Sequence, residues 1–245
     1  MYRALLFDLY DTVVTFHPRV PATQIAGTRW RTTMGWMTEA VTRELPGVAF
    51  DDFLRAITDT TAEIVRNRPP EYFEVPSPER FRRALLRLGI AEEADAKASR
   101  LSRAHMEHLA AATELPAPHL ALIRALSERF PLGLVSNFDH GPTARVVIDR
   151  HGLTTLFRSI VISDGFGRRK PHPTIFRFAL NELGVDADDA VFIGDSAVDD
   201  VAGAHASGID AVWINARGAA LPEGVPPPRY VVTALGELPD VLGIG

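Results

Sequence analysis

The sequence predicts an α/β protein, with a doubly wound parallel sheet and a helical cap domain inserted after the first strand. Two observations lead to this prediction. From residue 116 onward, short apolar runs alternate with helical periodicity, which is typical of strand–helix–strand units. From about residue 21 to about residue 114, only helical periodicity is found, although a strand-like run precedes it. We therefore assign 1–14 and 115–245 to the core and 15–114 to the cap.

The first predicted strand ends at Asp8. The run Leu5-Leu6-Phe7 is continuously apolar, as in a strand buried on both faces, and Asp8 is the first charged residue after it. The inserted segment then shows helical patterns bounded by the helix-breaking residues Pro46-Gly47 and Gly89. The expected cap helices span 24–45, with a break near Gly35, then 51–64, 76–88 and 91–114.

The second half contains four further strand-like runs and an expected edge strand. Pro173 suits the first position of a helix and Gly184 the position just past its end, which brackets one helix clearly. The expected strands span 132–135, 160–162, 190–193 and 211–214, with the edge strand at 230–232. The expected helices span 119–129, 142–150, 173–183 and 199–207.

The composition excludes several classes of protein. Of the 245 residues, 46% are apolar, which is enough for a full hydrophobic core. The absence of cysteine excludes disulfides and thiol chemistry, and no apolar run approaches the roughly 20 residues of a membrane span. A net charge of -5 argues against general nucleic-acid binding. Because no signal-peptide pattern precedes Ala4, we expect a cytoplasmic protein. We expect it to be either a monomer or a homodimer.

Polar clusters follow the predicted strands. Because the carboxyl ends of parallel strands lie at one edge of the sheet, these clusters should converge there. Each alone has an ordinary explanation, such as a turn or a helix N-cap. Their recurrence along one chain indicates a ligand site. The clusters are Asp8 to Thr12, Ser136-Asn137, Lys170, and Asp195-Ser196 with Asp199-Asp200.

The charges of these clusters predict a divalent cation. Four carboxylates in one small region raise one another's pKa, and Lys170 alone cannot neutralise them. Oxygen ligands favour Mg²⁺. Asp8 and Asp195 are the first candidate ligands, and either Asp199 or Asp200 would complete or support the set.

The same residues suit phosphoryl transfer. A cation and Lys170 would neutralise the phosphoryl oxygens while the Asp8 carboxylate attacks in line and forms an acyl-phosphate. Thr12 and Ser136 offer hydroxyl groups to those oxygens. With Asn137 and Lys170, they are the candidate substrate-binding residues.

The chain resembles the haloacid dehalogenase-like (HAD) hydrolase superfamily, in the branch with a helical cap after the first motif. The resemblance covers nearly the whole chain. It runs through Phe-Asp-Leu-Tyr-Asp-Thr at 7–12, Leu-Val-Ser-Asn-Phe-Asp at 134–139, Arg-Lys-Pro-His-Pro-Thr-Ile-Phe at 169–176, and Ile-Gly-Asp-Ser at 193–196 with Asp199-Asp200. It implies a Rossmann-like catalytic core and a small-molecule substrate chosen by cap residues.

The resemblance also implies individual roles. Asp8 would be the nucleophile, and Ser136 and Lys170 would bind the phosphoryl group. The backbone carbonyl of Tyr10 and the Asp195 carboxylate would bind Mg²⁺, with an acidic residue at 199 or 200 completing its coordination.

The first motif departs from the phosphatase pattern at Tyr10. Phosphatases of the superfamily usually carry a second aspartate there, which protonates the leaving group. Asp11 is not expected to replace it, since one step along an extended chain turns a side chain to the opposite face. General acid–base help is worth roughly 10²–10⁴ in rate, so activity on alkyl phosphates should be weak and activity on aryl phosphates less affected.

Three functions remain open at this point. The first is a Mg²⁺-dependent phosphatase of low or specialised activity. The second is a metal-independent dehalogenase, because 2-haloacid dehalogenases carry tyrosine at the position of Tyr10; against this, Asp195 is retained and Ala197 stands where they carry asparagine. The third is a non-catalytic descendant that binds a phosphorylated ligand or a protein partner.

Overall fold

The core is a six-stranded parallel sheet. The computed structural model describes residues 2–17, 20–25 and 28–244. The strand order is β10-β9-β8-β1-β6-β7, and every neighbouring pair is parallel. The strands are β1 (Ala4–Phe7), β6 (Leu132–Ser136), β7 (Ser159–Ile162), β8 (Ala190–Gly194), β9 (Asp210–Ile214) and β10 (Tyr230–Val232). The predicted doubly wound α/β fold is confirmed, with β10 at one edge.

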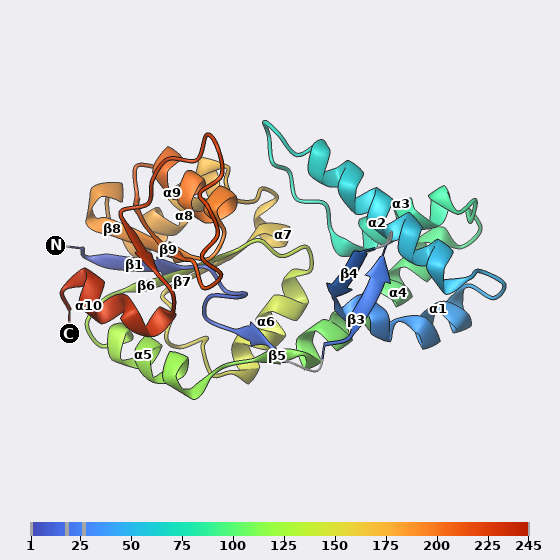
Figure 1. Ribbon diagram of the computed structural model, residues 1–245, viewed down its shortest axis with the longest axis horizontal. Coiled ribbons are helices and arrows are strands. Elements are labelled where there is room, and N and C mark those ends of the chain that lie inside the picture. The colour runs from blue at the N-terminus through green and yellow to red at the C-terminus, as the bar shows by residue number, and fades with distance from the viewer. Residues whose placement is uncertain (1, 18–19, 26–27, 245) are drawn as a thin grey trace.

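Helices cover both faces of this sheet (Figure 1). They are α5 (Ala117–Ser127), α6 (Gly141–Arg150), α7 (Ser163–Phe166), α8 (Pro173–Leu183), α9 (Ala202–Ala206) and α10 (Leu238–Leu242). Short turns of helix occur at η2 (Ala187–Asp189), η3 (Ala197–Val201) and η4 (Leu235–Glu237). The helix expected at 199–207 is thus two elements, because the chain first makes a π-helical turn at η3.

Successive β1 residues face opposite sides of the sheet. Leu5 and Phe7 belong to one hydrophobic cluster with residues of α5 and α6, whereas Ala4 and Leu6 belong to the other with residues of α8 and α9. All four side chains are buried. This explains the uninterrupted apolar run of β1, and it makes the first residue after the strand the first that can carry charge.

The cap forms a second body beside the core (Figure 1). It contains α1 (Thr38–Glu44), α2 (Phe50–Arg66), α3 (Ser77–Arg87) and α4 (Ala94–Ala111), which enclose their own hydrophobic cluster. Where the chain passes between cap and core, β2 (Thr15–Phe16) pairs antiparallel with β5 (Thr113–Glu114). The two chain crossings are therefore held side by side.

The expected helix over 24–45 is wrong in its first part. The chain forms an antiparallel hairpin of β3 (Ala22–Ile25) and β4 (Thr28–Arg31), followed by the short helix η1 (Thr33–Trp36). Threonine, isoleucine and tryptophan favour the extended backbone of strands, and that preference prevails here over the helical spacing. Gly35 lies within η1 rather than at a break; a Cβ there would meet Thr23 Oγ1 at 2.3 Å.

No helix in the described part of the chain combines the length and apolar character needed to cross a membrane.

Two adjacent leucines of α3 test the cap core. Leu85 is fully buried in the cap cluster, whereas Leu86 is 43% exposed. We expect Leu85→Ala to lower the free energy of unfolding by about 2–5 kcal/mol, because it leaves a cavity. Leu86→Ala should change it by less than about 0.5 kcal/mol. Urea denaturation followed by circular dichroism measures both, and equal losses for the two variants would contradict the assigned packing.

Candidate active site

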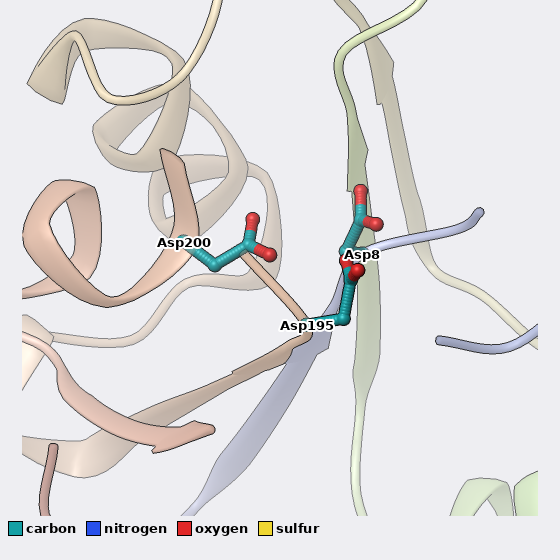
Figure 2. A group of neighbouring side chains, drawn as sticks. All are labelled: Asp8, Asp195 and Asp200. Atoms are coloured by element: carbon teal, nitrogen blue, oxygen red, sulfur yellow. The ribbon is translucent and has the colours of Figure 1, made fainter. Parts of the chain in front are cut away.

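Three aspartates meet at the carboxyl edge of the sheet. Asp8 follows β1, Asp195 follows the neighbouring strand β8, and Asp200 lies in η3. One carboxylate oxygen of each lies within 4.8 Å of those of the other two. Figure 2 shows Asp200 reaching toward Asp8 and Asp195 from the opposite side. Residues up to 192 positions apart in the sequence therefore form one acidic cluster, as expected from the sheet topology.

Lys170 is buried against this cluster. Its Nζ lies 2.6 Å from Asp8 Oδ1 and 2.7 Å from Asp200 Oδ1. The backbone at Lys170 is fixed by Asn137, whose Oδ1 accepts the Lys170 N–H at 2.7 Å and whose Nδ2 donates to its carbonyl at 3.0 Å. Both ends of the Asn137 amide therefore bind the Lys170 backbone. These hydrogen bonds do not support the predicted contact between Asn137 and the substrate.

The site carries more negative than positive charge. Burial, followed by the charges of Asp8 and Asp200, raises the pKa of Asp195 to about 7. Burial also raises the pKa of Asp200 to about 6, against the opposing effect of Lys170. Burial alone would lower the pKa of Lys170, but Asp200 and Asp8 outweigh it and hold that pKa above its ordinary value. The site thus holds three acids and one lysine, which contacts two of them directly.

This donor set fits a hard divalent cation. Asp8, Asp195 and Asp200 supply carboxylate oxygens close enough to share one ion, and such oxygens are the ligands that Mg²⁺ prefers. An added positive charge would also favour the ionised form of all three acids.

The two neighbouring acids of η3 have different partners. The Asp200 carboxylate joins the cluster and accepts the Ser196 N–H at 2.9 Å. Asp199 instead accepts a hydrogen bond from Asn137 Nδ2 at 3.1 Å. Gly194 makes this arrangement possible, because a Cβ there would lie 2.2 Å from Asp200 Oδ2. The sequence contained Gly194 within the last motif, but only the structure shows which carboxylate it admits.

Two buried hydroxyl groups near the acids are left for a ligand. Thr12 follows β1 and Ser136 ends the adjacent strand β6. Neither Oγ atom has a hydrogen-bond partner within the described part of the chain. Buried polar groups are usually paired, so each of these hydroxyls requires an explanation. A ligand with acceptor oxygens, such as a phosphoryl group, would satisfy both.

Tyr10 belongs to an aromatic stack. Its ring centroid lies 5.7 Å from that of Phe16 and 4.8 Å from that of Phe138, and both pairs are stacked. Burial, followed by the charge of Asp8, raises the pKa of the phenol further above its ordinary value. Within the described residues its hydroxyl has no partner. The side chain therefore packs, and it is poorly suited to give up a proton.

The expected extended backbone at Asp11 is wrong, because Asp11 has a φ of +60° and lies in a turn. Left-handed backbone in a non-glycine residue is uncommon, and it breaks the alternation of side chains. The Asp11 carboxylate contributes to the negative field at Asp195.

Sequence patterns did not reveal the contacts between cap and core. Glu74 of the cap is buried and accepts two hydrogen bonds of 3.0 Å from Arg169 Nη1, next to Lys170. Nearby, Arg80 of α3 pairs with Asp139 at 3.0 Å. Arg169 thus contacts a partner across the domain boundary, which no local pattern could indicate.

A family model described as haloacid dehalogenase-like hydrolase matches residues 2–208. This protein belongs to that hydrolase family. The matched segment contains all the residues of the acidic cluster and Lys170. The resemblance identified from the sequence motifs is therefore confirmed.

The curated relatives of this HAD-like hydrolase include a nucleotidase and several phosphatases. The chain is 30% identical over 154 residues to pyrimidine 5′-nucleotidase YjjG of Escherichia coli, and the match covers 62% of this chain and 67% of that protein. It is 41% identical over 132 residues to phosphoglycolate phosphatase of Rhodospirillum rubrum (51% and 54%). Over 123 residues it is 33% identical to human N-acylneuraminate-9-phosphatase (50% and 49%). The matches span about half the length of these last two proteins.

Solved structures share the whole fold of the hydrolase. A 2-haloacid dehalogenase from Pseudomonas syringae aligns with a TM-score of 0.71 at 24% identity, covering 99% of both chains. The putative HAD-hydrolase YfnB of Bacillus subtilis aligns with a TM-score of 0.68 at 21% identity, also over 99% of both. At these identities the likeness shows the fold alone.

The raised pKa values predict how Mg²⁺ should stabilise the hydrolase. Because the folded-state pKa of Asp195 lies above its ordinary value, the metal-free protein loses stability as the pH rises from about 4 through about 7. A cation bound to the ionised acids would reverse that loss. We therefore expect saturating Mg²⁺ to raise Tm by roughly 5–10 °C near pH 8 and by much less near pH 5.5.

Thermal unfolding of the wild type and two matched variants measures this effect. Asp195→Asn should remove most of the Mg²⁺-dependent increase in Tm, whereas Asp186→Asn, an exposed acid outside the cluster, should preserve it. A pH-independent increase, or one retained in Asp195→Asn, would rule out these carboxylates as the cation site.

Proposed function

We propose that this hydrolase is a Mg²⁺-dependent phosphatase that forms an aspartyl-phosphate on Asp8. The observation that carries the proposal is the cluster of Asp8, Asp195 and Asp200 around one buried lysine, Lys170. The names of the relatives, which include a nucleotidase and two phosphatases, support the same reaction class.

The residues of the site suggest a simple sequence of steps. The Asp8 carboxylate oxygen attacks phosphorus, a new P–O bond forms, and the bond to the ester oxygen of the substrate breaks. Lys170 and the hydroxyls of Thr12 and Ser136 donate to the phosphoryl oxygens and offset their growing charge. Water then hydrolyses the acyl-phosphate and regenerates the carboxylate.

The metal would be held by Asp8, Asp195 and Asp200, together with the backbone carbonyl of Tyr10. When bound, Mg²⁺ supplies positive charge next to the transferring phosphoryl group. Asp199 is assigned a supporting role, because its carboxylate accepts from Asn137, which in turn holds the Lys170 backbone.

We also propose that the cap, residues 15–114, selects the substrate, and that 1–14 with 115–245 form the catalytic core. Support comes from the separate hydrophobic cluster of the cap and from the β2–β5 pair at the two chain crossings.

Tyr10 favours one alternative, a dehalogenase-like hydrolase that displaces halide from carbon without a metal. Tyrosine at this position is the sequence feature shared with such enzymes. Release of halide from an L-2-haloacid in the presence of EDTA would support it.

The pair Asp199 and Asp200 tests the assignment of metal ligands. We expect Asp200→Asn to raise the Mg²⁺ concentration needed for half-maximal activity by at least about 10-fold, because a carboxylate of the cluster is lost. Asp199→Asn keeps an acceptor for Asn137 and should raise it by less than about 3-fold. Magnesium titrations of aryl phosphate hydrolysis measure both values. The reverse order would move the metal site to Asp199.

Leaving-group dependence tests the role of Tyr10. If neither Tyr10 nor Asp11 protonates the leaving group, an aryl phosphate should be hydrolysed about 10²–10⁴ times faster than an alkyl phosphate of similar size. Asp8→Asn should lower Mg²⁺-dependent turnover by at least about 10³-fold, because the nucleophile is removed. Tyr10→Phe, which retains the aromatic stack, should stay within about 3-fold of wild type. A large loss in Tyr10→Phe would show that the phenol takes part in proton transfer.

A further inference from the structure

A large cavity lies between the cap and the core. Its volume is about 790 Å³, and its wall comes from α2, η1, α3 and α4 of the cap and from the segment that follows β1. Pockets that enclose small-molecule ligands have volumes of about 300–1,000 Å³, so this one has room for a bulky organic group.

The cavity leads toward the acidic cluster. A second cavity, of about 530 Å³, is lined by Asp195 and Ser196. The two cavities share Asp11 and Arg217 as wall residues. The cap cavity therefore adjoins the cavity beside Asp195, one of the three clustered acids.

Most of the cavity wall is uncharged. Helix α2 contributes Ile57, Thr61 and Val65, which are spaced four residues apart and so share one face of the helix. Phe16 and Leu109 add apolar surface from β2 and α4. The wall thus offers methyl, methylene and aromatic groups with a few hydroxyls among them.

Two basic side chains of the described wall, Arg80 and His17, already face acids. Arg80 lies 3.0 Å from Asp139, and His17 lies 3.2 Å from Glu114. Burial raises the pKa of Asp11, and the nearby charge of Arg217 opposes that rise. A carboxylate or second phosphate on the substrate would therefore compete with existing pairs, and its burial would be unfavourable.

One buried polar side chain in the described part of the wall has an unpaired ring nitrogen. His105 Nε2 lies 3.0 Å from Thr33 Oγ1, whereas Nδ1 has no partner among the residues the structure describes. Burial, followed by the charge of Arg80, lowers the pKa of His105 to about 3. The ring is therefore neutral, and it offers a hydrogen-bonding atom without a charge.

We infer that this cavity receives the alcohol portion of the phosphate ester, and that this portion is bulky, uncharged and mainly apolar, such as an aromatic ring system with one hydrogen-bonding group. The inference rests on the proposed phosphatase function for the position of the phosphoryl group. It extends that function by naming the substrate class.

Three aryl phosphates whose leaving groups have similar acidity test the preference. We expect kcat/KM for 2-naphthyl phosphate to exceed that for phenyl phosphate by at least about 10-fold, since one methylene in an apolar pocket is worth about that much or more. The value for 4-(carboxymethyl)phenyl phosphate should fall at least about 10-fold below that for phenyl phosphate. Equal values for all three esters would overturn the inference.

A substitution in α2 tests whether this cavity causes the preference for the naphthyl ester. Thr61→Trp fills part of the space and should reduce the naphthyl-to-phenyl ratio of kcat/KM to about one. Asp59→Trp, on the exposed side of the same helix, should preserve the wild-type ratio. Circular dichroism and thermal unfolding confirm that both variants are folded. An unchanged ratio in folded Thr61→Trp would place the naphthyl group elsewhere.

Binding of non-hydrolysable phosphonates separates this inference from the proposed function. Calorimetry with naphthylmethylphosphonate and benzylphosphonate, in the presence of Mg²⁺, should show at least about 10-fold tighter binding of the larger ligand, and Thr61→Trp should remove the difference. If both binding results are obtained but no ester is hydrolysed, the cavity assignment stands and the phosphatase proposal fails. If esters are hydrolysed but neither preference appears, the phosphatase proposal stands and the cavity assignment fails.

Discussion

The site depends on one electrostatic constraint: Lys170 is buried between Asp8 and Asp200, and Asp195 adds a further carboxylate. Burying a charge is tolerated only when it is paired, and here the acids outnumber the base. Neighbouring residues fix the positions of these charged side chains. Asn137 fixes the backbone that carries the lysine, and the missing side chain of Gly194 admits the Asp200 carboxylate. A divalent cation is the simplest group that would complete the charge balance.

Topology brings these groups together. Because β1 lies between β6 and β8, the residue after β1 is flanked by the ends of two strands that are more than 120 positions away in the sequence. This is why Asp8, Ser136 and Asp195 could be grouped from the sequence alone: each follows or ends a recognisable apolar strand. Lys170 was also predicted, although it lies on a loop, because the motif around it is distinctive.

The remaining features depend on backbone geometry or on distant contacts, which apolar periodicity does not encode. The choice between Asp199 and Asp200 depends on a π-helical turn, and the position of Asp11 depends on a left-handed residue. The β3–β4 hairpin was missed because its spacing also fits a helix. Glu74 pairs with Arg169 across the domain boundary, and neither residue has a local signal for the other.

Two independent features of the structure favour the same kind of leaving group. The Tyr10 ring stacks between Phe138 and Phe16, and Phe16 also lines the cap cavity. In the proposed reaction this ring stands where related phosphatases usually carry the acid, and its stacking partner Phe16 forms part of the apolar cavity wall. An aromatic alcohol fits both conditions, because its anion leaves without protonation and its ring suits the uncharged cavity. If the proposed phosphatase function holds, the departure from the phosphatase motif at Tyr10 is part of substrate selection rather than a loss of function.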